Sequence, residues 1–125
     1  GSPTVDLLYQ RGIDALEAGD PVLAAGHLTA ALENAPDFAE GYNARATAYY
    51  LDGQIGPALD DLRQALVLNP NHFHAMQIFA VILGELDRPE EALEVFRRVH
   101  AINPGDTEVA ETVERLEMEL GGRTL

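Results

Sequence analysis

Three prolines recur at a constant interval of 34 residues along this chain. Pro36, Pro70 and Pro104 each follow a short apolar stretch, and in two of the three cases an asparagine stands directly before the proline. A constant period of this length is typical of repeat proteins, in which similar units stack on one another and bury a shared core. The spacing therefore predicts an array of similar units.

Small and large apolar residues keep the same register inside each unit. Small residues let neighbouring helix axes approach closely, and large side chains fill the remaining volume. A proline just past a helix stops it, whereas a proline at the first helical position is tolerated. Each unit is therefore predicted to be two helices joined by a short turn. The small positions are Gly12, Ala46 and Ala80, then Ala24, Ala58 and Ala92; the large positions are Leu28, Leu62 and Phe96; the starting prolines are Pro21, Pro57 and Pro89.

A seventh helix is predicted from about residue 106 to 120. Its apolar residues, from Val109 to Leu120, are spaced by four, three and four, which gives one apolar stripe along a helix. Gly121 and Gly122 are expected to end this helix, and Gly1-Ser2 is typical of a remnant left by tag removal. The residues expected to cap the helices after the closing prolines are Asp37, Asn71 and Asp106.

This register of small residues and closing prolines resembles the tetratricopeptide repeat (TPR) family, and the chain is similar to small three-repeat proteins of bacterial type. The resemblance implies an all-α fold, a right-handed α–α superhelix (solenoid) of three helix pairs plus a C-terminal capping helix. It places a lead-in at residues 1–4, repeats at 5–38, 39–72 and 73–106, the capping helix at 107–120 and a tail at 121–125, all within a single domain.

The formal net charge of −13 limits the partners that the chain can bind. Nucleic acids and anionic membrane surfaces attract clustered Lys and Arg, so both are disfavoured. No apolar run approaches the roughly 18 residues of a membrane-spanning helix, so no membrane insertion is expected. Cysteine is absent, which excludes disulfides but suits several compartments. Localisation stays open between cytoplasm and periplasm, because a natural N-terminus could have been truncated.

No pattern in the sequence points to catalysis. The chain has no Gly-rich phosphate loop, nucleophile elbow or HExxH motif, and the stretch from Asp52 to Asp61 lacks the alternating carboxylates of a Ca²⁺ loop. His72 and His74 are two residues apart, so on a helix they point to different sides. The sequence therefore predicts no enzyme activity, no metal site and no cofactor.

The resemblance also implies a binding surface, because TPR proteins usually hold a partner peptide on the concave face formed by the first helix of each pair. Carried over by position, the carboxylates of this face are accompanied by tyrosine and amide side chains. The implied partner is a protein or peptide with basic and apolar residues, although general surface acidity explains the same charges. The expected face comprises Asp6, Tyr9, Ile13, Leu16 and Glu17, then Glu40, Asn43, Thr47, Tyr50 and Leu51, then His74, Gln77, Ile78, Val81 and Glu85.

One specialised function of the family is disfavoured by these residues. TPR modules that clamp the C-terminal carboxylate of heat-shock chaperones use Lys, Arg and Asn side chains on their first helices. No fixed cation stands at the matching positions, so a chaperone-tail carboxylate is not the expected ligand. Those positions are Tyr9, Ile13, Ala44, His74 and Ile78.

Arg11 and Arg45 occupy the same place in two successive units. The structural interpretation is a salt bridge or a cap, formed with Asp14 or a neighbouring carboxylate. The functional interpretation is binding of a ligand carboxylate. For the protein as a whole, the leading hypothesis is an adaptor that binds a polypeptide segment. A self-associating structural module and an accessory domain of a larger or exported protein are the alternatives.

Overall fold

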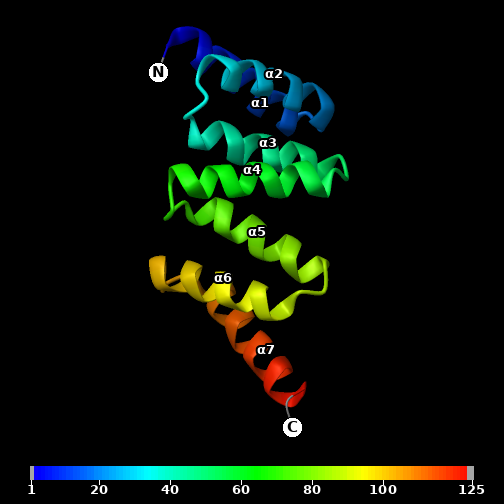
Figure 1. The fold of residues 1–125 in the computed structure, drawn as a ribbon, viewed down its shortest axis with the longest axis vertical. Coiled ribbons are helices and arrows are strands. Elements are labelled where there is room, and N and C mark those ends of the chain that lie inside the picture. Colours follow the sequence, from blue (N-terminus) through cyan, green and yellow to red (C-terminus); the bar gives the residue numbers. More distant parts are fainter. Residues whose placement is uncertain (1, 124–125) are drawn as a thin grey trace. The chain divides into compact units, whose positions relative to one another are not determined.

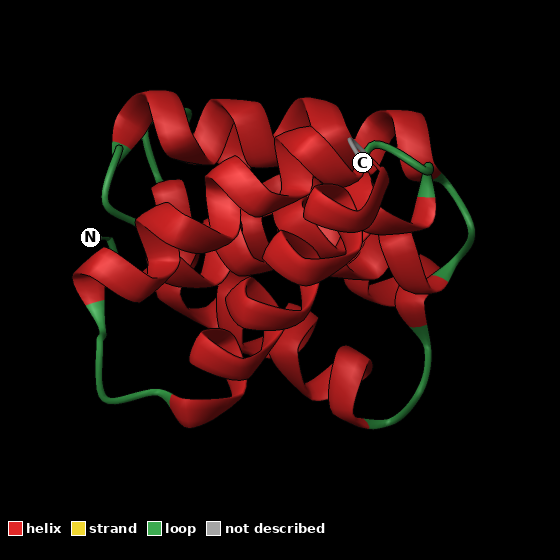
Figure 2. Ribbon diagram, turned by 90° about the horizontal axis from the view of Figure 1, so that it is seen from below, coloured by secondary structure: helices red, strands yellow, loops and turns green. Residues whose placement is uncertain are grey.

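The structure is a computed structural model that describes residues 2–123. Throughout this range short loops join α-helices. No strand occurs in this range, so the predicted all-α fold class is confirmed (Figure 2). The helices are α1 (Pro3–Glu17), α2 (Pro21–Asn34), α3 (Ala39–Leu51), α4 (Ile55–Leu68), α5 (Phe73–Glu85), α6 (Pro89–Ile102) and α7 (Thr107–Arg123) (Figure 1).

The helices divide into two compact units, Gly1–Pro70 and Asn71–Leu125, which are called here the N-terminal and the C-terminal unit. In the N-terminal unit α1 packs against α2 and α3 packs against α4, while α3 also contacts α2 and α1. In the C-terminal unit α6 packs against both α5 and α7. Within each unit, therefore, successive helices are packed neighbours, as the two-helix repeat predicts.

The small residues of the repeat register lie where helices meet. Ala24, Ala46 and Ala58 are completely buried. At Gly12 on α1, a Cβ atom would lie 2.6 Å from Cγ of Leu28 on α2, and Leu28 is itself completely buried. Because that distance is far below van der Waals contact, the close approach of α1 and α2 requires glycine at this position.

The turn inside each helix pair uses a left-handed backbone residue. Gly19 has a φ of 79° and Gly53 a φ of 77°, and glycine adopts this region without a steric penalty. The third pair has Asp87 at the equivalent position, with a φ of 56°. A residue with a Cβ atom is strained in this conformation, although aspartate tolerates it better than most.

Two of the three capping predictions are wrong. Asp106 caps α7 as predicted, since its Oδ1 accepts from the Val109 N–H at 3.3 Å. The N-cap of α5 is His72 rather than Asn71, and its Nδ1 accepts from the Ala75 N–H at 3.1 Å. The N-cap of α3 is Phe38 rather than Asp37, and it forms no side-chain hydrogen bond because phenylalanine has no polar side-chain atom. The Phe38 ring packs edge-on against Tyr9.

Both ends of the chain are more helical than predicted. Ser2 caps α1 by accepting from the Val5 N–H at 3.2 Å, so the helix starts at Pro3 inside the expected lead-in. At the other end α7 continues past Gly121 to Arg123, so the prediction that the two glycines end it is wrong. Glycine ends a helix by adopting the left-handed conformation, whereas Gly121 keeps helical backbone. The rest of the expected tail, residues 124–125, lies outside the described range.

Candidate functional site

The first helix of each of the first two pairs, α1 and α3, carries part of the predicted face. The Tyr9 ring on α1 makes an edge-to-face contact with Phe38, with 5.1 Å between ring centroids. Burial raises the pKa of Tyr9, and the negative charge of Glu40 on α3 raises that pKa further. Tyr9 and Glu40 were predicted separately, from positions 31 residues apart, and they are electrostatic neighbours in the structure.

The other predicted residues of this unit are reachable from solvent to different degrees. Their charged members are exposed, whereas the aromatic, amide and aliphatic members are half-buried, apart from one exposed leucine. The N-terminal unit therefore presents exposed carboxylates together with half-buried aromatic, amide and aliphatic side chains. The exposed members are Asp6, Glu17, Glu40 and Leu51, and the half-buried members are Tyr9, Ile13, Leu16, Asn43, Thr47 and Tyr50.

Asn43 on α3 has an enclosed amide oxygen without a partner. Its Oδ1 is shielded from solvent and accepts no hydrogen bond from the described residues. The neighbouring Thr47 hydroxyl donates instead to the backbone carbonyl of Asn43, at 3.2 Å. A buried polar atom without a partner costs about 1–3 kcal/mol, and such a cost often marks a residue that is retained for function.

The C-terminal unit carries the remaining predicted residues on α5. His74, Val81 and Glu85 are exposed, whereas Gln77 and Ile78 are half-buried. The ring of Phe73 lies 4.1 Å from that of His74, between centroids. The two units thus each present one part of the predicted set, and each part is a candidate surface by itself.

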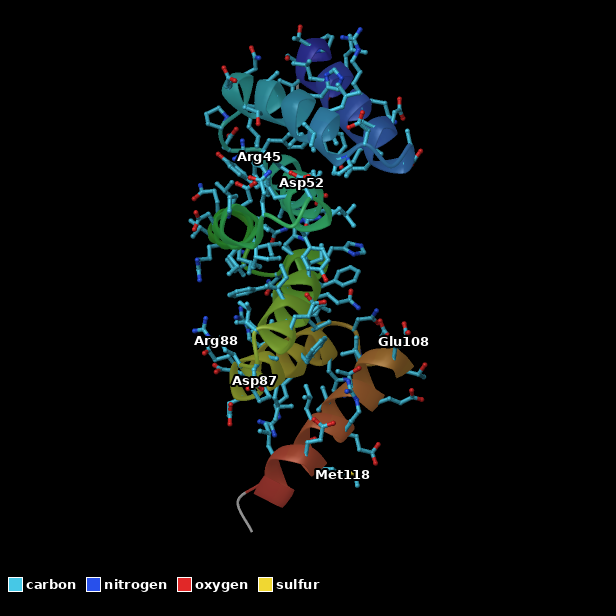
Figure 3. The ribbon with its side chains drawn as sticks, turned by 90° about the vertical axis from the view of Figure 1, so that its right-hand side faces the viewer. Arg45, Asp52, Asp87, Arg88, Glu108 and Met118 are labelled. Atoms are coloured by element: carbon cyan, nitrogen blue, oxygen red, sulfur yellow. The ribbon has the colours of Figure 1, made fainter. Side chains whose placement is uncertain are left out.

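A pocket in the C-terminal unit was not predicted from the sequence. It has a volume of about 420 Å³ and lies among α5, α6 and α7. Asp87, in the turn between α5 and α6, also lines it, and Figure 3 labels this residue. Val81 is the one predicted face residue that lines it. The remaining lining includes Gly84 on α5 and Arg115 and Glu119 on α7. The residue type that could have indicated it in the sequence is Gly84, an exposed glycine within α5.

Arg45, labelled in Figure 3, donates three side-chain hydrogen bonds inside the N-terminal unit. Its Nε and Nη2 each donate to the Asp61 carboxylate at 2.8 Å, and its Nη1 donates to the Thr29 hydroxyl at 3.2 Å. Its guanidinium also lies 5.7 Å from the Tyr42 ring centroid and 5.6 Å from that of Tyr49. The hydrogen bonds to Asp61 raise the pKa of Arg45 above its usual value, against the lowering effect of burial.

These contacts confirm the structural interpretation of Arg45, a salt bridge within the fold. The partner is Asp61 on α4, not Asp14, which accepts from the Gln10 side chain at 2.9 Å. Through Thr29 on α2 and Asp61 on α4, Arg45 on α3 links three helices. Arg11, at the equivalent position of the first unit, is exposed.

Among residues 2–123, no three His, Asp or Glu side chains are grouped closely enough to hold a metal ion. None of the helices in that range is long and apolar enough to cross a membrane.

The helices are paired, with small residues at their contacts, and the first helix of a pair carries accessible acidic, amide and aromatic side chains. These features are typical of a helical-repeat scaffold for protein interactions. A family model described as tetratricopeptide repeat matches residues 9–72. The chain therefore belongs to the tetratricopeptide repeat family.

Similar proteins extend the likeness over almost the whole chain. A TPR repeat-containing protein of Rhizobium etli is 32% identical over 98% of this chain, and a protein SGT1 homolog of Bos taurus is 31% identical over 92%. The chain spans 60% of the first of these relatives and 34% of the second. The Rhizobium relative agrees with the bacterial type that the sequence suggested.

Solved structures show the same fold. The first TPR of Spaghetti (RPAP3), bound to the HSP90 peptide SRMEEVD, has a TM-score of 0.88 at 21% identity, covering 97% of this chain and 96% of its own. The TPR2B domain of yeast Sti1, in a complex with pHsp70, has a TM-score of 0.85 at 21% identity, covering 94% and 99%. MamA has a TM-score of 0.86 at 21% identity, covering 96% of this chain and 71% of its own. At these identities the likeness establishes the fold.

Proposed function

We propose that this chain is an adaptor that binds a polypeptide segment with basic and apolar residues along the first helices of its pairs. The observation that carries the proposal is that the negative charge of Glu40 on α3 acts on the half-buried Tyr9 on α1, where it adds to the burial that raises the pKa of Tyr9. A carboxylate and a ring at one place suit an arginine or lysine side chain, since the cation pairs with the one and its stem packs on the other. A related TPR structure that holds a peptide, and a second one in a complex with pHsp70, support a polypeptide ligand.

The ligand class of those related structures differs from the one proposed. The HSP90 peptide bound to the first TPR of RPAP3 ends in the acidic sequence EEVD. In this chain the five positions expected to clamp such a tail hold tyrosine, two isoleucines, a buried alanine and an exposed histidine. They are Tyr9, Ile13, Ala44, His74 and Ile78. Since none supplies a permanent positive charge, we expect an acidic tail to be repelled.

Charge reversal at Glu40 tests this proposal. The probe is an acetylated and amidated peptide of about twelve residues built from repeated Arg-Ser-Leu, compared with its Glu-Ser-Leu counterpart. Glu40→Lys is expected to weaken binding of the basic probe about tenfold, which corresponds to about 1.4 kcal/mol, and the affinity of the unmodified chain should fall with added salt. Fluorescence anisotropy of the labelled probe measures both effects.

The matched control is Glu90→Lys. Glu90 also lies in the first turn of its helix, but on α6, a second helix of its pair. Both reversals carry the same helix-dipole cost, so an equal loss of affinity in the two variants would mean that the probe senses net charge alone. Equal binding of the acidic and basic probes would also contradict the proposal.

Replacing Asn43 separates its role in binding from its role in stability. Asn43→Leu removes the enclosed amide oxygen that lacks a partner, so the free energy of unfolding is expected to rise by about 1–3 kcal/mol. The same change removes an amide that can pair with a peptide backbone, so the basic probe is expected to bind several-fold more weakly. Urea unfolding and anisotropy measure the two quantities, and a more stable variant with undiminished affinity would show that Asn43 plays no part in binding.

A further inference from the structure

We propose that the pocket among α5, α6 and α7 of the C-terminal unit receives one apolar side chain of a polypeptide ligand and that carboxylates in its lining hold a basic side chain next to it. This inference deepens the proposed function and rests on it, because it assigns a particular place in the C-terminal unit to part of the same kind of ligand. The pocket volume of about 420 Å³ falls in the range in which proteins bind small groups.

The lining of the pocket combines polar and apolar surface, and its apolar part comes from residues on all three helices. Phe96 and Ala92 on α6 and Leu116 on α7 are buried residues that line it. Val81 on α5 also lines it, and 43% of that residue is exposed. At Gly84 a Cβ atom would meet nothing within 4 Å, so this side of the pocket is open space. An apolar group entering there would cover surface that the fold leaves partly exposed, which favours binding.

The edge of the pocket carries more negative than positive charge. Asp87 and Glu119 supply two carboxylates, and Arg115 supplies one guanidinium. Arg115 and Glu119 form an ion pair at 4.0 Å, and both side chains are largely exposed, at 62% and 50%. An exposed pair at this distance contributes little to stability, so Glu119 can be shared with an incoming cation. The excess carboxylate favours a basic residue beside the apolar one.

The backbone at Asp87 gives an independent reason to assign a role to its carboxylate. The equivalent turns use Gly19 and Gly53, which adopt the left-handed conformation without strain. Asp87 adopts the same conformation with a side chain, and the residue lines the pocket. A local conformational rule that is broken at one of three equivalent turns, next to a cavity, is typical of a functional position.

Filling the pocket without disturbing the fold is the sharpest test. Gly84→Leu places a side chain in the open space, and since Gly84 is helical, the change also favours the helix. The matched control is Gly26→Leu on α2, where a Cβ atom likewise meets nothing within 4 Å. The melting temperatures of both variants are expected to equal or exceed that of the unmodified chain.

The probe is a nonapeptide of glycine and arginine with one central photoreactive leucine analogue. We expect its cross-links, mapped by mass spectrometry on the full chain, to fall on residues around the pocket, including Val81, Thr112 and Leu116. In Gly84→Leu these cross-links should drop at least tenfold, whereas Gly26→Leu should keep them. A peptide with glutamate in place of arginine should give few cross-links.

Asp87→Gly supplies a second variant with opposite effects on two measurements. Removing the strained side chain should leave the melting temperature unchanged or raised, while the same cross-links should fall several-fold because a carboxylate is lost. Cross-links elsewhere on the chain, or unchanged cross-links in Gly84→Leu, would overturn the pocket assignment. If Glu40→Lys still weakened the Arg-Ser-Leu probe in that case, the proposed function would stand without the pocket; if it did not, both would fail.

Discussion

Replacing Arg45 with alanine is expected to lower the free energy of unfolding of the N-terminal unit by about 3–5 kcal/mol. The change leaves the carboxylate of Asp61, whose side chain is 8% exposed, without the two hydrogen bonds at 2.8 Å that now satisfy it. It also removes the donor to Thr29 and the cation over two tyrosine rings. Urea unfolding followed by circular dichroism measures the loss.

A double variant shows whether the loss comes from an uncompensated buried charge. Arg45→Met combined with Asp61→Leu replaces the pair by apolar groups, and we expect it to recover most of the stability, since well-packed apolar groups often substitute for buried ion pairs at no net cost. If Arg45→Ala alone cost less than about 1 kcal/mol, as exposed pairs do, the pair would not be the link between α2, α3 and α4 described above.

The contact between Gly12 and Leu28 gives the second large effect. Leu28→Ala should cost about 2–5 kcal/mol, because Leu28 is completely buried between helices and its removal leaves a cavity. Gly12→Ala alone should lower the free energy of unfolding. Overpacking costs about 1–3 kcal/mol, and the higher helix propensity of alanine offsets about 1 kcal/mol of that cost. Thermal and urea unfolding of both variants measure these changes.

The decisive comparison is Gly12→Ala introduced into Leu28→Ala. There the added methyl group enters the cavity, so the same substitution that destabilises the unmodified chain should now stabilise it. A change of sign of this kind is the signature of two residues in direct contact. Simple additivity of the two single changes would show that α1 and α2 do not pack through this pair.

The fold was predictable because its determinants are local and repeated. Pro36, Gly12 and Ala24 each specify a helix end or a close contact through their own chemistry, and the 34-residue period repeats that information three times. The all-α class and the helix pairs follow from such residues. The helix ends were less predictable: the cap at His72 depends on which rotamer turns Nδ1 toward the Ala75 N–H.

The candidate site was only partly predictable, since much of it depends on packing between helices. Tyr9 and Glu40 lie on the first helices α1 and α3, as their repeat positions predict. Asp61 was missed as the partner of Arg45, 16 residues away, because the pair exists only when α3 packs on α4. The pocket was missed for the same reason, since it needs α5, α6 and α7 together.

The most direct test of the central claim maps a bound peptide onto the chain residue by residue. In ¹H–¹⁵N correlation spectra of the full chain titrated with the Arg-Ser-Leu probe, we expect saturable shifts on α1 and α3, including Tyr9, Glu40 and Asn43. Shifts spread evenly over exposed carboxylates of the second helices, such as Glu33 on α2 and Asp60 on α4, would contradict it. They would show that the acidity of this face belongs to the surface in general and selects no partner.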